Sequence, residues 1–288
     1  PSGGAKIIYQ HCDLLNQLGF QAHPVHLGRF NLDWFPHECS PMQAKQALRE
    51  LRSDDVVVCP EVIPDAAMPF ADARRVVFVQ GWSLVGERDY AAMGFERVLT
   101  VSTFCQQFMQ KRTELPCHRV TNGIDLDLFK PRPVKRIGSR VLYLARKQPE
   151  LARQVIMALP EPLRDSTEFV ALENQYSQQE MIEYYQSAEV FMTLSYPEGF
   201  GLPSLEAMAC GCAVVGFTGG GGGEHMIDNV SAAVAEDGDT PRAAAKLEKL
   251  LVEPDYREKI RQGGTETAQK FGINRMKYEL KEFAESLT

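Results

Sequence analysis

The stretch EVFMTLSYPEGFGLPSLEAMACGCAVVGFTGGGGGEHM, residues 189–226, decides the fold class of this chain. Its first seven residues are mostly apolar and have the length of a buried strand, and AVVGF at 213–217 predicts a second strand. Between them, LPSLEAMAC at 202–210 has Pro203 near its first turn, where a helix loses no hydrogen bond to proline. Strand, turn, helix and strand in this order predict a parallel α/β sheet.

The same alternation of apolar runs and amphipathic segments continues along the chain. Short runs rich in Val, Phe and Leu predict buried strands, and segments with apolar residues three and four apart predict helices. The predicted fold class is therefore α/β, with doubly wound parallel sheets. The predicted strands are 20–27, 55–60, 75–80, 97–102, 140–145, 168–172, 189–195, 213–217 and 231–235, and the predicted helices include 5–19, 103–112, 150–159, 178–188, 202–210 and 274–288.

The length of the chain predicts two domains. Its 288 residues, of which 44% are hydrophobic and 24% charged, suffice for two modest cores. Prolines and basic residues interrupt the alternation at DLDLFKPRPVKRIGSR, residues 125–140. We therefore predict one domain at 1–133 and a second at 134–288. The last helix either packs outside the second sheet or returns to the first domain.

Composition excludes several classes of function. A formal net charge of -7 argues against a nucleic-acid partner, which normally meets a basic face. The seven cysteines show no paired C-x-x-C spacing, which favours reduced thiols and a cytoplasmic protein. No run approaches the roughly twenty apolar residues of a transmembrane segment. A lipid-linked substrate could still bring the protein to the inner face of a membrane.

Two glutamates and two glycine-rich turns stand where such sheets bind ligands. Ligands of open α/β sheets bind at the carboxyl ends of the strands, which is where YPEGFG lies. The backbone amides of residues 199–202 and the positive end of the following helix suit a diphosphate. Glu198 and Glu206 could each accept hydrogen bonds from a different hydroxyl-bearing part of one ligand. An isolated glutamate is more often a solvated acid, but the small residues after Glu206 imply close packing near the turn and favour a site.

The run EGFGLPSLEAMACGCAVV resembles the E-x7-E signature region of the retaining glycosyltransferase family 4. The resemblance extends to VTNGIDLDLFKP at 120–131, to VLTVSTF at 98–104 and to SGGA at 2–5. These segments occur in the family's order and cover most of the chain. The resemblance implies the GT-B fold, in which two Rossmann-like, doubly wound domains face each other across a cleft.

The resemblance also implies functions for particular residues. Glu206 would bind the ribose of a nucleotide, Glu198 would contact the donor sugar, and Arg146 would stabilise the departing diphosphate. Glu198 and Arg146 are therefore the predicted catalytic residues. The predicted substrate-binding residues are Gly3, Gly4, Lys147, Gly199, Phe200, Gly201, Leu202 and Glu206.

The predicted activity is retaining transfer of a sugar from a nucleoside-diphosphate sugar to an acceptor hydroxyl. The acceptor would be a glycan or a lipid-linked molecule, as in polysaccharide or glycoconjugate biosynthesis. No cofactor, no metal and no covalent enzyme nucleophile are expected. Three alternatives remain: a GT-B epimerase or phosphorylase, a non-catalytic homologue that binds sugar nucleotides, and a scaffold in a polysaccharide assembly complex.

Three features depart from the family pattern or stand outside it. Many relatives carry a histidine where this chain reads FVQGWS at 78–83, and its histidines form no H-x-x-x-H pair. The glycines at 219–223 come too close to the next strand for a dinucleotide fingerprint, so we interpret them as a mobile backbone shell around the donor sugar. A flexible loop is the alternative. Because the glycine turn at 2–5 precedes any strand, we also expect a strand of roughly five to ten residues upstream.

Overall fold

The structure is a computed structural model of the chain. It divides into two compact units, one formed by Pro1–Asn122 and Asn274–Thr288 and the other by Gly123–Ile273. The predicted division at residue 133 lies later in the chain. Residues 123 and 124 belong to the second unit, where the amide of Ile124 donates to the Phe271 carbonyl and the amide of Ile273 donates to the Ile124 carbonyl, both at 2.9 Å. The residues that the structure describes are 3–28, 33–132, 136–137, 139–145, 147–173 and 176–287.

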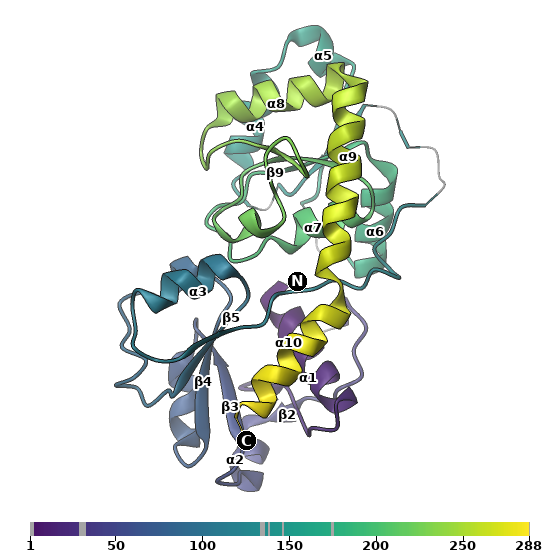
Figure 1. The fold of residues 1–288 in the computed structure, drawn as a ribbon. Coiled ribbons are helices and arrows are strands. Elements are labelled where there is room, and N and C mark those ends of the chain that lie inside the picture. The colour runs from purple at the N-terminus through teal and green to yellow at the C-terminus, as the bar shows by residue number, and fades with distance from the viewer. Residues whose placement is uncertain are drawn as a thin grey trace. The chain divides into compact units, whose positions relative to one another are not determined.

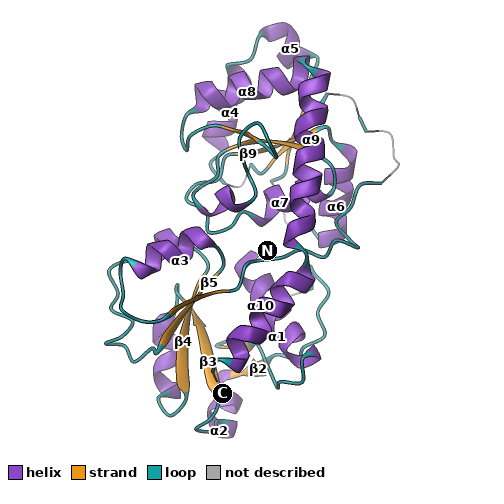
Figure 2. Ribbon diagram, viewed as in Figure 1, coloured by secondary structure: helices purple, strands orange, loops and turns teal. Residues whose placement is uncertain are grey.

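The first unit is built on a four-stranded parallel sheet with the order β3-β4-β5-β6. Figure 2 shows β3, β4 and β5 as neighbouring arrows. Valines of these strands, with Phe95, form its core. The strands are β3 (Val56–Pro60), β4 (Arg74–Val79), β5 (Arg97–Thr100) and β6 (Cys117–Arg119), and a separate parallel pair is formed by β1 (Val25–His26) and β2 (Met42–Gln43).

Helices from both ends of the chain belong to this first unit. The α-helix α10 begins at Ile273, and Figure 1 shows it beside α1. Its Lys277 donates a 3.0 Å hydrogen bond to the side chain of Gln17 at the end of α1. Glu279 of α10 also accepts a 2.6 Å bond from the backbone of Thr121. The helices of this unit are α1 (Gly3–Gln17), α2 (Ala44–Glu50), α3 (Thr103–Gln110) and α10 (Ile273–Glu285), with 3-10 turns η1 (Pro64–Phe70) and η2 (Trp82–Leu84).

The second unit contains a five-stranded parallel sheet with the order β11-β10-β9-β7-β8. Both sheets confirm the predicted α/β class. Every residue of β9 and β10 is buried, as expected for strands covered on both faces. The strands are β7 (Arg140–Tyr143), β8 (Glu168–Ala171), β9 (Val190–Thr193), β10 (Ala213–Gly216) and β11 (Ala233–Val234).

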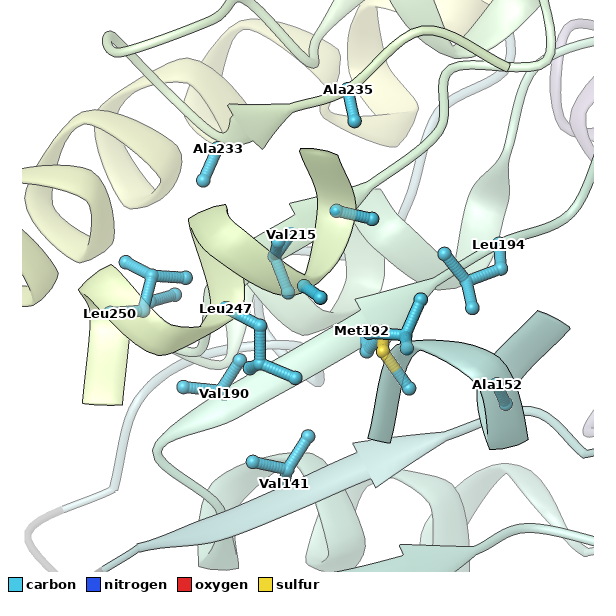
Figure 3. Close-up of a cluster of buried hydrophobic side chains, with 14 of the residues drawn as sticks. Val141, Ala152, Val190, Met192, Leu194, Val215, Ala233, Ala235, Leu247 and Leu250 are labelled. Atoms are coloured by element: carbon cyan, nitrogen blue, oxygen red, sulfur yellow. The ribbon is translucent and has the colours of Figure 1, made fainter. Parts of the chain in front are cut away.

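One face of this sheet packs against the amphipathic helix α8. Figure 3 shows Leu247 and Leu250 of α8 beside strand residues such as Val190 and Val215. These side chains are fully buried, and burying each stabilises the unit by about 1.5–3 kcal/mol relative to exposure. The helices of the second unit are α4 (Pro149–Met157), α5 (Glu161–Asp165), α6 (Gln178–Ser187), α7 (Leu202–Ala209), α8 (Thr240–Val252) and α9 (Pro254–Ala268), with η3 (Gly221–Glu224) and η4 (Gln269–Phe271).

Candidate functional site

The strand order of the second unit points to a candidate binding site between β7 and β9. The chain proceeds from β7 outward to β8 and then returns to the other side of β7 as β9. Such a reversal opens a crevice at the carboxyl ends of the two strands, where α/β sheets bind ligands. Lys147 follows β7 and Glu198 follows β9, and the Lys147 ammonium lies 2.8 Å from a Glu198 carboxylate oxygen. The structure therefore joins two predicted site residues.

This ion pair contributes little to stability. The Lys147 side chain is 47% exposed and that of Glu198 is 23% exposed. Pairs with this much solvent access contribute about 0–1 kcal/mol. Each side chain can therefore leave this ion pair and contact a ligand at low cost in free energy. Arg146, the other predicted phosphate-binding cation, lies outside the described residues.

The turn at Glu198 is fastened to the glycine run by backbone hydrogen bonds. The amide of Glu198 donates to the Gly219 carbonyl at 2.8 Å, and the amide of Gly221 donates to the Glu198 carbonyl at 3.0 Å. A Cβ atom on Gly221 would lie 1.8 Å from the carbonyl oxygen of Gly199. The two backbones therefore lie closer together than a residue with a side chain at position 221 would allow. The glycine run is packed against the Glu198 turn.

The first turn of α7 begins at a left-handed glycine. Gly201 has φ +82°, a conformation that glycine adopts at little cost, and Leu202 and Pro203 follow as the first helical residues. The Phe200 side chain is 2% exposed and packs against the rings of His225 and Phe271. Because this side chain is buried, Phe200 can contact a ligand only through its backbone, beside the amides at the positive end of the helix.

Glu206 lies inside α7 and is 9% exposed. The buried hydroxyl of Tyr185, on α6, donates a 3.4 Å hydrogen bond to its carboxylate. Burial and the Glu206 charge raise the pKa of Tyr185 well above its usual value, so this hydroxyl remains a donor. Tyr185 thus holds one oxygen of Glu206 in place, a contact that the sequence analysis missed because it joins two helices.

Two further residues beside this turn were missed. Ser204 and His225 are 2% and 0% exposed, and the Ser204 hydroxyl lies 2.8 Å from Nε2 of His225. Burial lowers the pKa of His225 to about 3, so its ring is neutral near pH 7. One signal for His225 is visible in the sequence, its position two residues after the glycine run, but the sequence analysis treats the histidines as a group.

In the first unit, Gly3 and Gly4 form the beginning of α1. A Cβ atom on Gly4 would lie 3.2 Å from the side-chain nitrogen Nε2 of Gln80, a residue that directly follows β4. Beside Gln80, the backbone of Gly81 donates a 2.7 Å hydrogen bond to the carboxylate of Glu61, which is 2% exposed and has a pKa raised by burial. Glu61 was not predicted as a site residue.

The cysteines and the acidic side chains give no metal centre in the described part of the chain. All seven cysteines are free thiols, and no three His, Cys, Asp or Glu side chains gather there to hold an ion. Cys212 donates to the Tyr185 carbonyl at 3.0 Å, and burial raises its pKa to about 11. Metal independence stays a prediction.

Among the residues that the structure describes, no helix combines the length and apolarity that crossing a membrane requires.

Comparison with known proteins identifies the fold and shows which family the second unit resembles. Residues 147–267 match the model of the family described as glycosyl transferases group 1. D-inositol 3-phosphate glycosyltransferase of Nocardiopsis dassonvillei is 32% identical over 111 residues, which are 38% of this chain and 26% of that protein. Sucrose-phosphate synthase from Thermosynechococcus elongatus has a similar structure, with a TM-score of 0.76 at 15% identity over 99% of this chain and 94% of that one.

A second solved structure extends the likeness. Anabaena HepE in complex with UDP-glucose has a TM-score of 0.71 at 14% identity, over 99% of this chain and 97% of that chain. The fold is therefore that of the GT-B glycosyltransferases, with two Rossmann-like domains. The match over 147–267 relates the second unit of this chain to the glycosyl transferases of group 1. The chain spans between 22% and 48% of the length of the D-inositol 3-phosphate glycosyltransferases it matches.

Proposed function

We propose that the protein transfers a sugar from a nucleoside-diphosphate sugar to an acceptor hydroxyl, with retention at the anomeric carbon. The observation that carries this proposal is the pairing of Lys147 with Glu198 at the strand reversal between β7 and β9. A cation and the amides at the start of α7 suit a diphosphate, and a carboxylate suits sugar hydroxyls. HepE, which has a similar fold, is known with UDP-glucose bound.

Each residue of this site has a distinct task in the proposed reaction. The α7 amides, Lys147 and Arg146 would stabilise the negative charge that develops on the departing diphosphate. Glu198 would position the donor sugar and stabilise its oxocarbenium-like centre. Glu206, held by Tyr185, would accept hydrogen bonds from the ribose. The leaving phosphate would take the acceptor's proton on the same face of the sugar, so that no covalent nucleophile and no metal are needed.

The proposed setting is the synthesis of a polysaccharide or glycoconjugate in the cytoplasm. The acceptor would be a glycan or a lipid-linked molecule, and the second kind would bring the protein to the inner face of a membrane. A GT-B epimerase or phosphorylase and a non-catalytic sugar-nucleotide-binding protein are the alternatives. They differ from a transferase in the product that they release, or in releasing none.

A donor panel followed by product analysis tests the proposal. The melting temperature is measured with UDP-, GDP-, ADP- and dTDP-sugars, because a ligand that binds the folded state raises it. The stabilising donor is then incubated with glycan and lipid-linked acceptors, and the products are identified by mass spectrometry. A glycosylated acceptor with the donor's anomeric configuration supports retaining transfer. Free epimerised sugar nucleotide, free sugar phosphate or an inverted linkage would contradict it.

A further inference from the structure

Two buried polar side chains of the second unit connect the glycine run to α7. Ser204 is the third residue of α7, and His225 directly follows η3. The Ser204 hydroxyl oxygen lies 2.7 Å from the carbonyl oxygen of Gly201 and 2.8 Å from Nε2 of His225. Neither side chain reaches solvent, so both act through the residues that they contact.

The chemistry of the hydroxyl fixes the direction of both hydrogen bonds. A carbonyl oxygen can only accept, so the one hydroxyl hydrogen of Ser204 is donated to Gly201. Ser204 must then accept its second bond from His225, whose Nε2 carries the proton of the neutral ring. Hydrogen bonds therefore run in sequence from His225 to Ser204 to Gly201. Among the described residues, Nδ1 of His225 is buried without a hydrogen-bond partner.

The two ends of this series of hydrogen bonds, His225 and Gly201, lie in the two segments that frame the proposed donor site. Gly201 is the left-handed residue at which α7 begins, and its carbonyl also accepts from the backbone of Leu205 at 3.4 Å. At the other end, the backbone of His225 donates a 3.2 Å bond to Gly222 in the glycine run, and its ring centroid lies 5.2 Å from that of Phe200. The bonds thus fasten the glycine run and the first turn of α7 together.

We propose that Ser204 and His225 are positioning residues that hold the first-turn amides of α7 in the orientation that binds the donor diphosphate. This inference rests on the proposed function. Glycine can adopt many backbone conformations, so a turn that begins at Gly201 needs hydrogen bonds from other residues to keep one geometry. Donors aimed in advance at a charge bind it without reorganisation, whereas a shift of about 1 Å can reduce activity by about a hundredfold.

Matched variants separate this role from simple packing. Ser204→Ala removes the hydroxyl, and Ser204→Thr keeps it. His225→Phe keeps a ring against Phe200 but removes the donor, and His225→Gln keeps an N–H donor of similar reach. The probe is the nucleoside diphosphate of the donor that stabilises the unchanged protein in the panel. Calorimetry measures its affinity at a temperature where circular dichroism shows each variant to be folded.

The expected result is a split between the members of each pair. Ser204→Ala and His225→Phe should bind the nucleoside diphosphate about ten- to a hundredfold more weakly, with a matching rise in KM for the donor. Ser204→Thr and His225→Gln should recover most of the affinity. Melting temperatures that fall with unchanged affinity would overturn the positioning role alone. Failure of the unchanged protein to bind any nucleoside diphosphate would overturn the proposed function and this inference together.

Discussion

Replacing Gly221 with alanine tests whether the glycine run is packed as a fixed part of the site. The new Cβ would lie 1.8 Å from the Gly199 carbonyl oxygen and 2.1 Å from its carbon, whereas contacts under 3.0 Å essentially never occur. The backbones must therefore separate by about 1 Å, which breaks the hydrogen bond from Gly221 to Glu198. Overpacking costs about 1–3 kcal/mol, and an unsatisfied buried backbone group costs about as much again.

Gly223 is the matched control in the same run. Like Gly221 it has no left-handed φ, but it is exposed and no atom lies within 4 Å of its added Cβ. Gly223→Ala should change stability by no more than about 0.5 kcal/mol. Gly221→Ala should lose about 3–5 kcal/mol, which lowers the melting temperature of a unit of this size by roughly 10 °C.

The assay is thermal unfolding of both variants, followed through the transition that shifts with the stabilising donor. Donor binding should be lost or weakened only in Gly221→Ala, because the displaced backbone carries the Glu198 turn with it. Equal and small effects of the two substitutions would refute the packed arrangement. The five glycines would then be a flexible loop.

Three further predictions concern the carboxylates, the metal and the pH. Glu206→Ala should weaken nucleoside diphosphate binding about 10- to 100-fold, whereas Glu198→Ala should lower kcat more than affinity; equal losses of affinity by calorimetry would contradict this division. Activity should survive EDTA, and an activity that EDTA abolishes and manganese or magnesium restores would reveal a missed metal site. Burial holds the pKa of His11 at about 4 and that of His225 at about 3, against 6.5 when unfolded, so the unfolded state binds protons that the folded state does not. The free energy of unfolding, measured by chemical denaturation, should therefore fall as the pH drops below 6.5, by about 2 kcal/mol per histidine at pH 5. The His225→Phe variant keeps only His11, so its free energy of unfolding should fall by about half as much over the same pH range.

Local sequence determined the strands and the turn of the site. Residues 76–79 of β4 and 190–192 of β9 are all apolar because both faces of a parallel sheet are covered, and such runs are visible in a single sequence. Gly201 and Pro203 mark the start of α7 because each has a backbone preference of its own. Where local signals were weaker the prediction was less accurate: the strand predicted at 20–27 is only Val25–His26.

Only the tertiary structure decided which residues meet. Lys147 and Glu198 are joined because β7 and β9 are neighbours in the sheet, although β8 lies between them in the chain. The contact of Tyr185 with Glu206 and that of Ser204 with His225 each join separate segments, and no spacing in the sequence encodes such a distance. Residue type and local periodicity depend on near neighbours along the chain. Hydrogen-bond partners depend on how the packed sheet and helices bring distant neighbours together, and a single sequence carries no record of that packing.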